Sequence, residues 1–266
     1  MTSQESFLER KLPLSVAIIT KDEEESLPAC LQSVSFADDV VVVDSGSTDK
    51  TVEIAKRLGA RVFIEEWKGY GPQKNMAVAR CLHEWVLILD ADERLASGAK
   101  EAIEKAISGN NAGVDACSLQ RKNFLNGRWI KRLGWWPDEL VRLVRKDKGS
   151  FASLVHEKWT AQGGVSRLNA AIEHHPFTGY EEMLKKLNEY SGLAATELFR
   201  SGKRASSLTP FTHGAVSFAK MYFLKLGFLE GFDGFIIAAT NAGGSFFKYA
   251  KLKELQDRDE KNSKTR

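Results

Sequence analysis

The sequence has few cysteines, no long hydrophobic run and almost no net charge. Its three cysteines, Cys30, Cys81 and Cys117, are odd in number and far apart, so they support neither a disulfide framework nor a metal-binding CxxC pair. A net charge of +3 is too small to indicate a nucleic-acid partner. The amino terminus, MTSQESFLERK, lacks the apolar segment of a secretion signal. We therefore expect a cytoplasmic protein with buried, reduced thiols and no nucleic-acid partner.

Sequence motifs of two common nucleotide-binding folds are also missing. No GxGxxG follows the first strand-like stretch, and no GxxxxGK[ST] occurs, so dinucleotide-binding and P-loop folds lack their phosphate-binding loop. The overall composition, 43% hydrophobic and 27% charged, is ordinary for a globular protein. The 266 residues suffice for one large domain or two modest domains.

Short apolar runs alternate with helical patterns in the first half of the chain. We expect strands at 14–20, 39–43, 61–64 and 86–89. We expect a first helix that begins in KDEEESL and carries Leu27, Cys30, Leu31 and Val34 inward, a second helix at 49–58 with Ser47 or Thr48 as cap, and a third at 72–82. The acidic residues at 22–25 would lie at the start of the first helix. This alternation predicts an α/β fold with a mostly parallel central sheet and helices on both faces.

The predicted strand at 86–89 ends in an acidic cluster, Asp90, Asp92 and Glu93. In open α/β sheets, ligands bind at the carboxyl ends of the strands. Two carboxylates separated by one residue can hold a divalent cation, Mg²⁺ or Mn²⁺, and through it a diphosphate. A lone DxD is more often a solvated acidic turn, so its interpretation depends on the neighbouring strand ends.

The ends of the first two strands and the start of the 72–82 helix add polar groups. These are Thr20, Asp22, Asp44, Gly46, Lys74 and Asn75. Asp44 can accept a hydrogen bond from a nucleobase imide, and Gly46 allows close approach of the backbone. Lys74 and Asn75 can add a cation and a hydrogen bond near the phosphates. Each residue alone is commonly a turn or surface residue, but together they indicate a nucleotide site at one edge of the sheet.

The second half of the chain has a different character. Strand patterns return at 116–120, 140–144 and 165–168, whereas 121–140 is dense in aromatic and charged residues, which favours a partly exposed binding surface. Helical patterns cover 180–199 and 217–255, the latter with a break near Gly231. We accordingly expect a catalytic domain at 12–178 (halves 12–115 and 116–178), a helical region at 179–255 and a disordered tail at 256–266.

Several stretches resemble a known family. LSVAIITKDEEESL, VVVDSGSTDKT, GPQKNMA and WVLILDADE resemble the nucleotide-binding half of family 2 glycosyltransferases, which have the GT-A fold. WWPDELVRLVR, LVHEKW and FLKLGFLEGFDGF are similar to the lipopolysaccharide-core glucosyltransferases of the WaaE/KdtX type. The resemblance places Asp22 and Glu23 near the donor. At this pair the family usually has Asn before Glu, so Asp22 is a departure.

The resemblance implies inverting, metal-dependent transfer of glucose from UDP-glucose to a heptose of the lipopolysaccharide inner core, through a β-1,4 linkage. Asp92 would hold the metal, with Asp90 beside it on the metal or the ribose, and the metal would neutralise charge on the leaving diphosphate. Asp138, in WWPDEL, matches the family's general base, which takes the proton of the attacking hydroxyl. Glu139 is the neighbouring candidate for the same role.

Other side chains can support these groups. Arg142 follows Asp138 by four residues and can approach the diphosphate or orient the base. Trp135 and Trp136 offer flat faces of the kind on which sugar rings stack. The resemblance also implies that His156, in LVHEKW, completes the metal shell or touches phosphate. Two further histidines, which spacing does not separate, are His174 and His175.

Basic and apolar residues are mixed between Arg200 and Glu254. Eight Lys and Arg residues stand against three acids there, and the longest uncharged run, 205–219, is shorter than the ~18 to 20 residues that span a bilayer. This composition suits a helix that lies in the membrane interface or one that is buried by packing. We favour peripheral attachment to the inner face of the cytoplasmic membrane, where a lipid-linked acceptor would be met.

Other functions remain as alternatives. A family 2 transferase could act on another lipid-linked or polysaccharide acceptor. A sugar nucleotidylyltransferase would carry a Gly-rich basic loop after the first strand, where this chain has KDEEES, and a DxD phosphatase places its acidic pair after the first strand. A non-catalytic membrane-surface binding module is the fourth alternative.

Overall fold

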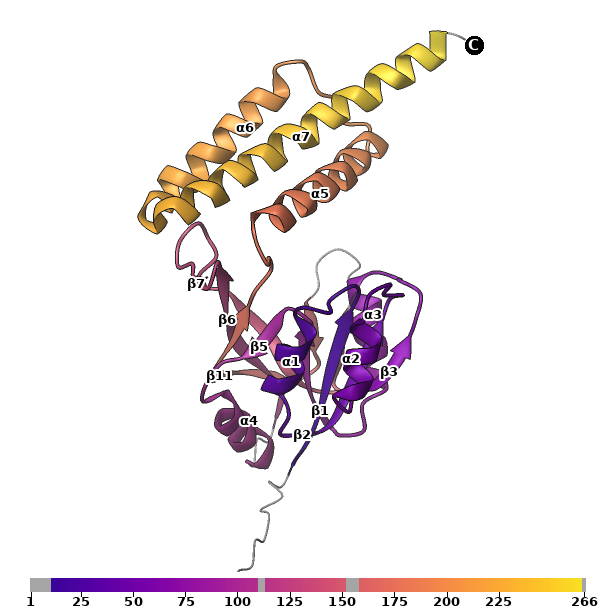
Figure 1. The fold of residues 1–266 in the computed structure, drawn as a ribbon, viewed down its shortest axis with the longest axis vertical. Helices are drawn as coiled ribbons and strands as arrows, with labels where there is room; N and C mark the ends of the chain where they lie inside the picture. The colour runs from indigo at the N-terminus through magenta and orange to yellow at the C-terminus, as the bar shows by residue number, and fades with distance from the viewer. Residues whose placement is uncertain (1–10, 110–112, 152–157, 265–266) are drawn as a thin grey trace, which may run out of the picture. The chain divides into compact units, whose positions relative to one another are not determined.

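The chain forms two compact units. The computed structural model describes residues 11–109, 113–151 and 158–264. A sheet unit contains the described residues of Met1–Lys122 and Asp138–His174, and a helical unit contains those of Asn123–Pro137 and His175–Arg266 (Figure 1). The helical unit therefore begins at His175 and also includes 123–137, whereas the sequence predicted a boundary at 178/179.

The sheet unit begins with alternating strands and helices and ends with strands. Its elements are β1 (Leu12–Thr20), α1 (Leu27–Ser33), β2 (Ala37–Asp44), α2 (Thr51–Arg57), β3 (Arg61–Ile64), α3 (Tyr70–Ala79), β4 (Trp85–Asp90), β5 (Glu93–Leu95), α4 (Ala99–Ser108), β6 (Val114–Leu125), β8 (Glu139–Arg145), β9 (Gly149–Phe151), β10 (Trp159–Ala161) and β11 (Gly164–His174). The last residues of β6 belong to the helical unit.

One sheet organises this unit, in the strand order β3-β2-β1-β4-β8-β6-β11-β5, with β7 (Arg128–Trp129) paired to the end of β6. The central strands β3, β2, β1 and β4 are parallel, and β8 runs antiparallel to both β4 and β6. The predicted mostly parallel central sheet is thereby confirmed. Register places Thr20 opposite Asp44 and Ile19 opposite Asp90, so the polar strand ends meet at one edge.

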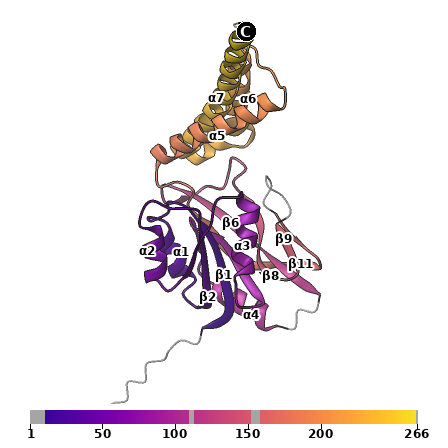
Figure 2. The ribbon, with the colours of Figure 1, turned by 90° about the vertical axis from the view of Figure 1, so that its right-hand side faces the viewer.

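Helices cover both faces of the sheet, as Figure 2 shows for α1 and α2 on one side and α3 on the other. On the first face, Val16 and Ile18 pack with Leu27 of α1. On the second, Ile19 packs with Ala77 of α3. Because β1 is buried on both faces, its sequence is a continuous apolar run rather than an alternating one.

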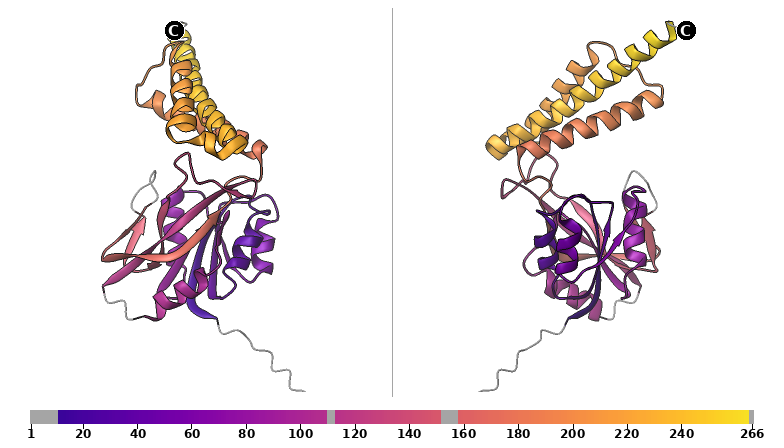
Figure 3. Two further views of the ribbon diagram at one scale, coloured as in Figure 1. Left: turned by 90° about the vertical axis from the view of Figure 1, so that its left-hand side faces the viewer. Right: turned by 45° about the vertical axis from the view of Figure 1, so that its right-hand side comes forward.

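The helical unit contains α5 (Tyr180–Arg200), α6 (Thr209–Ala219), a π-helical turn η1 (Lys220–Leu224), a 3₁₀ turn η2 (Gly227–Glu230) and α7 (Gly231–Lys264). The long α7 lies beside both α5 and α6 (Figures 1 and 3). The core of the helical unit includes Leu125, Ile130 and Leu133, each at most 1% exposed, together with Ile237. The sequence favoured a partly exposed binding surface at 121–140 over a core element, and this is wrong for these three apolar residues, because they belong to the core of the helical unit.

The carboxyl-terminal tail differs from the prediction of disorder from 256 onward. Helix α7 continues to Lys264. Gln256 is buried, and its side-chain amide bonds to the backbone of Ala205. The helical pairs Lys253–Asp257 and Glu254–Arg258 join successive turns. Polar composition alone missed this extension because a helix with one buried side and i,i+4 ion pairs needs few apolar residues.

The start of α2 also differs from the expected capping by Ser47 or Thr48. The residue before α2 is Lys50, and its side chain makes no capping bond. Ser47 Oγ instead donates to Asp44, and Thr48 Oγ1 donates to Asp22. Both hydroxyls are used to organise the loop at the sheet edge rather than the helix.

Candidate active site

A cavity of about 380 Å³ opens beside the end of β4. It is lined by Lys74, Asp90, Arg121, Glu139, Leu140, Val141, Arg142, Phe151, Lys158 and Trp159. Four of these are predicted site residues, Lys74, Asp90, Glu139 and Arg142, and they come from α3, β4 and β8. The fold thus brings together residues that are as much as 68 positions apart in the sequence.

Asp90 is held between two buried cations. Its Oδ1 is 2.8 Å from Lys74 Nζ, and its Oδ2 accepts a hydrogen bond of 2.9 Å from Arg142 Nη2. Burial alone would raise the pKa of Asp90, but the charges and hydrogen bonds of Lys74 and Arg142 outweigh it and hold the pKa well below its usual range. Asp90 is therefore ionised throughout the neutral range.

Glu93 is a fully buried acid that the sequence did not single out as a site residue. Its Oε1 accepts hydrogen bonds from Arg142 (2.7 Å) and from Arg121 (3.3 Å), and its Oε2 accepts one from the Asp90 backbone N–H (3.0 Å). A buried carboxylate needs such partners, because an unpaired charge in the interior is costly. The available signal was its place in the DADE cluster.

Asp138, the predicted base, is connected to this network through Arg121. Arg121 Nε donates to Asp138 Oδ2 at 2.8 Å, and the Arg121 backbone N–H donates to the Asp138 carbonyl at 2.7 Å. Glu139 points to other partners, accepting from Ser118 Oγ at 2.6 Å and lying 3.6 Å from Arg167 Nε. The two neighbouring acids thus have separate partners: Asp138 is joined to the cavity's ion pairs through Arg121, whereas Glu139 lines the cavity itself.

The loop after β2 is closed by Asp44, which is fully buried. Asp44 Oδ1 accepts the backbone N–H groups of Gly46 and Ser47, both at 2.9 Å, and its Oδ2 accepts the Ser47 hydroxyl. Gly46 has a φ of +87°, which an L side chain rarely adopts. Both residues therefore shape the loop, and the imide contact predicted for Asp44 stays a prediction.

The acids after β1 fasten the same loop rather than begin α1, which starts only at Leu27. Asp22 Oδ1 accepts the Thr48 N–H at 2.7 Å, and the Asp22 N–H donates to Ser47 Oγ at 2.8 Å. The Glu23 N–H donates to Thr51 Oγ1 at 2.8 Å. The expectation of first-turn acids in α1 is wrong, because these residues cross-link two loops.

Two buried oxygens at this edge have no hydrogen-bond partner among the described residues: Thr20 Oγ1 and Gln73 Oε1. Both residues contact Ser45, through the Thr20 carbonyl at 3.0 Å and Gln73 Nε2 at 3.1 Å. Buried polar atoms normally find partners, so both are suited to a ligand's hydrogen bonds. Thr20 was predicted from its strand end, whereas Gln73 was missed.

Asn75 makes a different contact from the one expected. Its Nδ2 donates to the Phe151 carbonyl at 3.0 Å, and its Oδ1 accepts the Phe151 N–H at 2.9 Å. This paired contact attaches β9 to α3. Its predicted phosphate contact stays a prediction.

Comparison with known proteins decides the family. The profile of "Glycosyl transferase family 2" matches residues 15–166, more than half of the chain. The "Uncharacterized glycosyltransferase RT0209" of Rickettsia typhi is 34% identical over 254 residues, covering 91% of this chain and 87% of the relative. The chain belongs to glycosyltransferase family 2. The predicted GT-A fold and glycosyltransferase activity are thereby confirmed.

Two further proteins are similar to this transferase. The "Lipopolysaccharide core biosynthesis glycosyltransferase LpsC" of Rhizobium meliloti is 32% identical over 256 residues, covering 91% of this chain and 92% of that protein. Among solved structures, residues 1–349 of TarS from S. aureus, in complex with UDP, superpose with a TM-score of 0.46 and 17% identity, covering 93% of this chain and 92% of that chain.

The metal expected in the transferase has a suitable pair of donors. Asp92 Oδ2 lies 3.3 Å from His174 Nε2, and the two side chains are 18% and 16% exposed. Within the described ranges, no cluster of three or more His, Cys, Asp or Glu side chains could hold a metal ion. The Asp92 carboxylate fits a Mg²⁺ or Mn²⁺ that takes its other ligands from phosphate and water, whereas the His174 imidazole fits Mn²⁺ better than Mg²⁺. His156 lies outside the described residues, and metal ligation by Asp90 stays a prediction.

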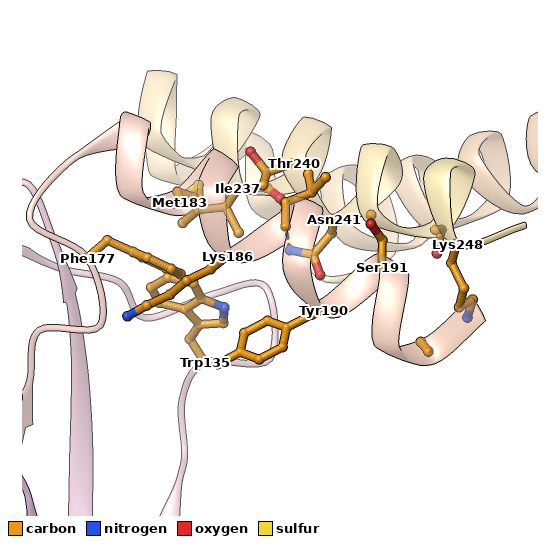
Figure 4. Close-up of a pocket in the computed structure, with 14 residues that line it drawn as sticks. Trp135, Phe177, Met183, Lys186, Tyr190, Ser191, Ile237, Thr240, Asn241 and Lys248 are labelled. Carbon is orange, nitrogen blue, oxygen red and sulfur yellow. Dashed lines mark hydrogen bonds between the residues drawn. The ribbon is translucent and has the colours of Figure 1, made fainter. Parts of the chain in front are cut away.

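Trp135 and Trp136 belong to the helical unit of the transferase. Trp135 lines a cavity of about 350 Å³ between α5 and α7, with Phe177 and Tyr190 among its other walls and Lys186 and Lys248 at its edge (Figure 4). The ring of Trp136 meets that of Trp129 edge to face, with centroids 5.0 Å apart. Predicted sugar contacts of both tryptophans stay predictions. His175 in this unit stacks on Phe124 at 4.9 Å.

Among the helices of the described ranges, none combines the length and the apolar character that a bilayer span requires.

Proposed function

We propose that the chain is an inverting glycosyltransferase of lipopolysaccharide core synthesis that transfers glucose from UDP-glucose to an inner-core heptose, forming a β-1,4 linkage. The observation that carries this proposal is the near full-length similarity to LpsC, whose name states a role in lipopolysaccharide core biosynthesis. The donor sugar, the acceptor and the linkage come from the resemblance described for the sequence. The cavity beside Asp90 supports a reaction between a diphosphate donor and a hydroxyl acceptor.

The donor diphosphate would be bound at the end of β4. Lys74 and Arg142 are buried cations, 3% and 4% exposed, that line the cavity, and Thr20 and Gln73 offer hydrogen-bonding oxygens to the nucleoside. Buried cations are effective for an anionic leaving group because little water screens them.

Charge balance supports a divalent cation in addition to these side chains. Three cations, Lys74, Arg121 and Arg142, already contact three carboxylates, Asp90, Glu93 and Asp138. A bound diphosphate would therefore add uncompensated negative charge. We assign the metal to Asp92 and His174, with Asp90 on the metal or the ribose; when bound, it would stabilise the charge that develops on the departing UDP.

Asp138 would act as the general base in this reaction. Its hydrogen bond with Arg121 positions the carboxylate, and a positioned carboxylate can take the proton of an acceptor hydroxyl. The deprotonated oxygen then forms a bond to the anomeric carbon as the bond to the diphosphate breaks, and UDP leaves with the bonding electrons. Attack opposite the leaving group inverts the configuration.

The acceptor would be met at the inner face of the cytoplasmic membrane. Its sugar rings would stack on Trp135 or Trp136, and Lys186 and Lys248, which line the same cavity as Trp135, could contact its anionic groups. The enzyme would then be a peripheral membrane protein.

The test is an assay of UDP release from UDP-glucose with a heptose-bearing lipid acceptor and with the same acceptor lacking the heptose. We expect release that depends on the heptose, requires Mg²⁺ or Mn²⁺, stops with a chelator, and yields a β-linked product by NMR. Asp92→Ala should abolish turnover, while Asp115→Ala, an acid that is not part of the site, should retain it. Full activity of Asp92→Ala in excess chelator would contradict the metal assignment, and transfer without the heptose would contradict the acceptor.

A further inference from the structure

The turn between α6 and α7 exposes many large apolar side chains. We call residues 223–232, FLKLGFLEGF, the apolar tip. Its exposed members are Phe223 (58% exposed), Leu224 (80%), Leu226 (37%), Phe228 (45%), Leu229 (56%) and Phe232 (68%). A contiguous set of this size on a protein surface marks an interaction site, because isolated proteins rarely leave such patches in water.

The backbone of the apolar tip is closely packed against its neighbours. A Cβ on Gly234 would lie 1.9 Å from the Gly227 carbonyl oxygen, and one on Gly227 would lie 2.8 Å from Leu133 Cδ2, so both glycines are needed for close packing. The Leu133 N–H also donates to the Lys225 carbonyl at 3.0 Å. The backbone is thus held from beneath while the apolar side chains face outward.

The acids of this region are turned inward. Glu230 and Asp233 are the two acidic residues between 198 and 253 in the sequence. Glu230 is 8% exposed, and its Oε1 accepts the Lys131 N–H at 2.9 Å while its Oε2 pairs with Arg128 at 2.9 Å. Asp233 Oδ1 accepts the Tyr180 hydroxyl at 3.0 Å. The tip therefore presents no unpaired carboxylate of its own.

The charges that remain exposed around the tip are positive. They are Lys131, Arg132, Lys220 and Lys225. We infer that the apolar tip inserts into the interface of an anionic phospholipid bilayer while these cations contact the headgroups. A second copy of the chain fits this surface less well, because pairing two tips would bring like charges together. The inference rests on the proposed membrane attachment and assigns it to one surface.

The lysines of the helical unit differ in their exposure and in their hydrogen-bond partners. Lys225 is exposed within the tip, whereas Lys251 Nζ is bonded to Asn188 Oδ1 at 2.9 Å and Ser191 Oγ at 2.8 Å. We expect Lys225 to contribute to lipid binding and Lys251 to contribute mainly to packing of α7 on α5.

The test compares vesicle binding of the full chain with that of a triple tip variant, Leu224→Ser, Phe228→Ser and Phe232→Ser. The matched control is Leu184→Ser with Leu193→Ser on α5, which are 58% and 62% exposed and outside the tip. Co-sedimentation with phosphatidylglycerol vesicles should weaken at least about tenfold for the tip variant, equivalent to about 1.4 kcal/mol. The control should bind like the unchanged protein. A Leu224→Trp variant should show a blue-shifted emission with these vesicles and none with phosphatidylcholine.

Three outcomes would overturn the inference. These are equal vesicle binding by the tip variant and the unchanged protein, no Leu224→Trp shift, and tip-dependent dimerisation in sedimentation velocity without vesicles. Transfer to a detergent-dispersed acceptor, measured in parallel, should be retained by the tip variant. If that transfer is retained but vesicle binding does not depend on the tip, the inference fails and the proposed function stands. If tip-dependent binding occurs without transfer to heptose, the tip inference is supported and the proposed acceptor is wrong.

Discussion

Arg121 contacts two carboxylates that are 45 residues apart in the sequence, Glu93 and Asp138. Neither contact follows from local pattern, because β5 and the start of β8 are brought to β6 only by the completed sheet. Asp138, Asp90, Asp92 and Lys74 could be named from motifs and strand ends. Arg121 could not, since a charged residue in a strand gives no sign of its partner. Glu93 could be named only as a member of the acidic cluster, without its buried partners.

At the scale of single residues, the choice of base can be tested directly. Asp138→Asn should retain donor binding but lose roughly 10²-fold or more in kcat, because it cannot accept the acceptor's proton. Glu139→Gln tests the competing candidate, since Glu139 also lines the cavity but bonds to Ser118 rather than Arg121. Steady-state kinetics with a saturating acceptor would measure both. A large kcat loss in Glu139→Gln, with Asp138→Asn active, would move the assignment by one residue.

The pH dependence of stability also belongs to single carboxylates. Burial would raise the pKa of Asp39, but hydrogen bonds from Arg61, Ser15 and the Leu82 N–H outweigh it and lower the pKa. A lowered folded-state pKa means that the unfolded chain binds more protons, so this stability is present above the unfolded pKa of about 3.9 and is lost as pH falls further. Urea unfolding at pH 6 and below pH 4 should show a smaller loss for Asp39→Asn than for the unchanged chain. An identical loss of stability in both proteins would contradict the role assigned to Asp39.

At the scale of secondary structure, Asn75 joins α3 to β9. Asn75→Ala removes both hydrogen bonds to the Phe151 backbone and should lower the free energy of unfolding by on the order of 1–3 kcal/mol. Asn169→Ala, at an exposed asparagine of β11, is the control and should change it little. Urea unfolding and the KM for UDP-glucose should be measured together. A raised KM with unchanged stability would favour the phosphate contact predicted from the sequence.

The sequence predicted secondary structure best where a short run of apolar residues was the main feature. The continuous apolar run of β1 was found because burial on two faces dictates composition. The 61–64 strand, observed as Arg61–Ile64 at the edge of the sheet, was also found from its short apolar run, although its residues are only partly buried or exposed. The loops after β1 and β2 were misjudged as a helix start and a cap. Their acids and hydroxyls satisfy each other across two loops, and such pairing is invisible to a window of neighbouring residues.

At the scale of the whole molecule, all three cysteines are free and buried. Burial, reinforced by Asp39, raises the pKa of Cys81 to about 12, and burial with the acids near β4 raises that of Cys30. Because the thiolate is the reactive form, we expect no rapid reaction with Ellman's reagent in the native state at pH 8 and three equivalents after denaturation. A fast-reacting thiol in native protein would show that one of these sites opens to solvent.

The helical unit is assembled from two separate pieces of the chain, 123–137 and the carboxyl-terminal helices. Shortening the protein after His174 would therefore not release an intact sheet unit. It would leave Leu125, Ile130 and Leu133 without the Ile237 side of their shared core, and such uncovered apolar side chains promote aggregation. Because the helical unit is built from two separate pieces of the chain, an ancestral protein could not have gained or exchanged it by fusion at one end alone. Residues 123–137 and the carboxyl-terminal helices must change together. We therefore expect correlated substitutions between 123–137 and those helices.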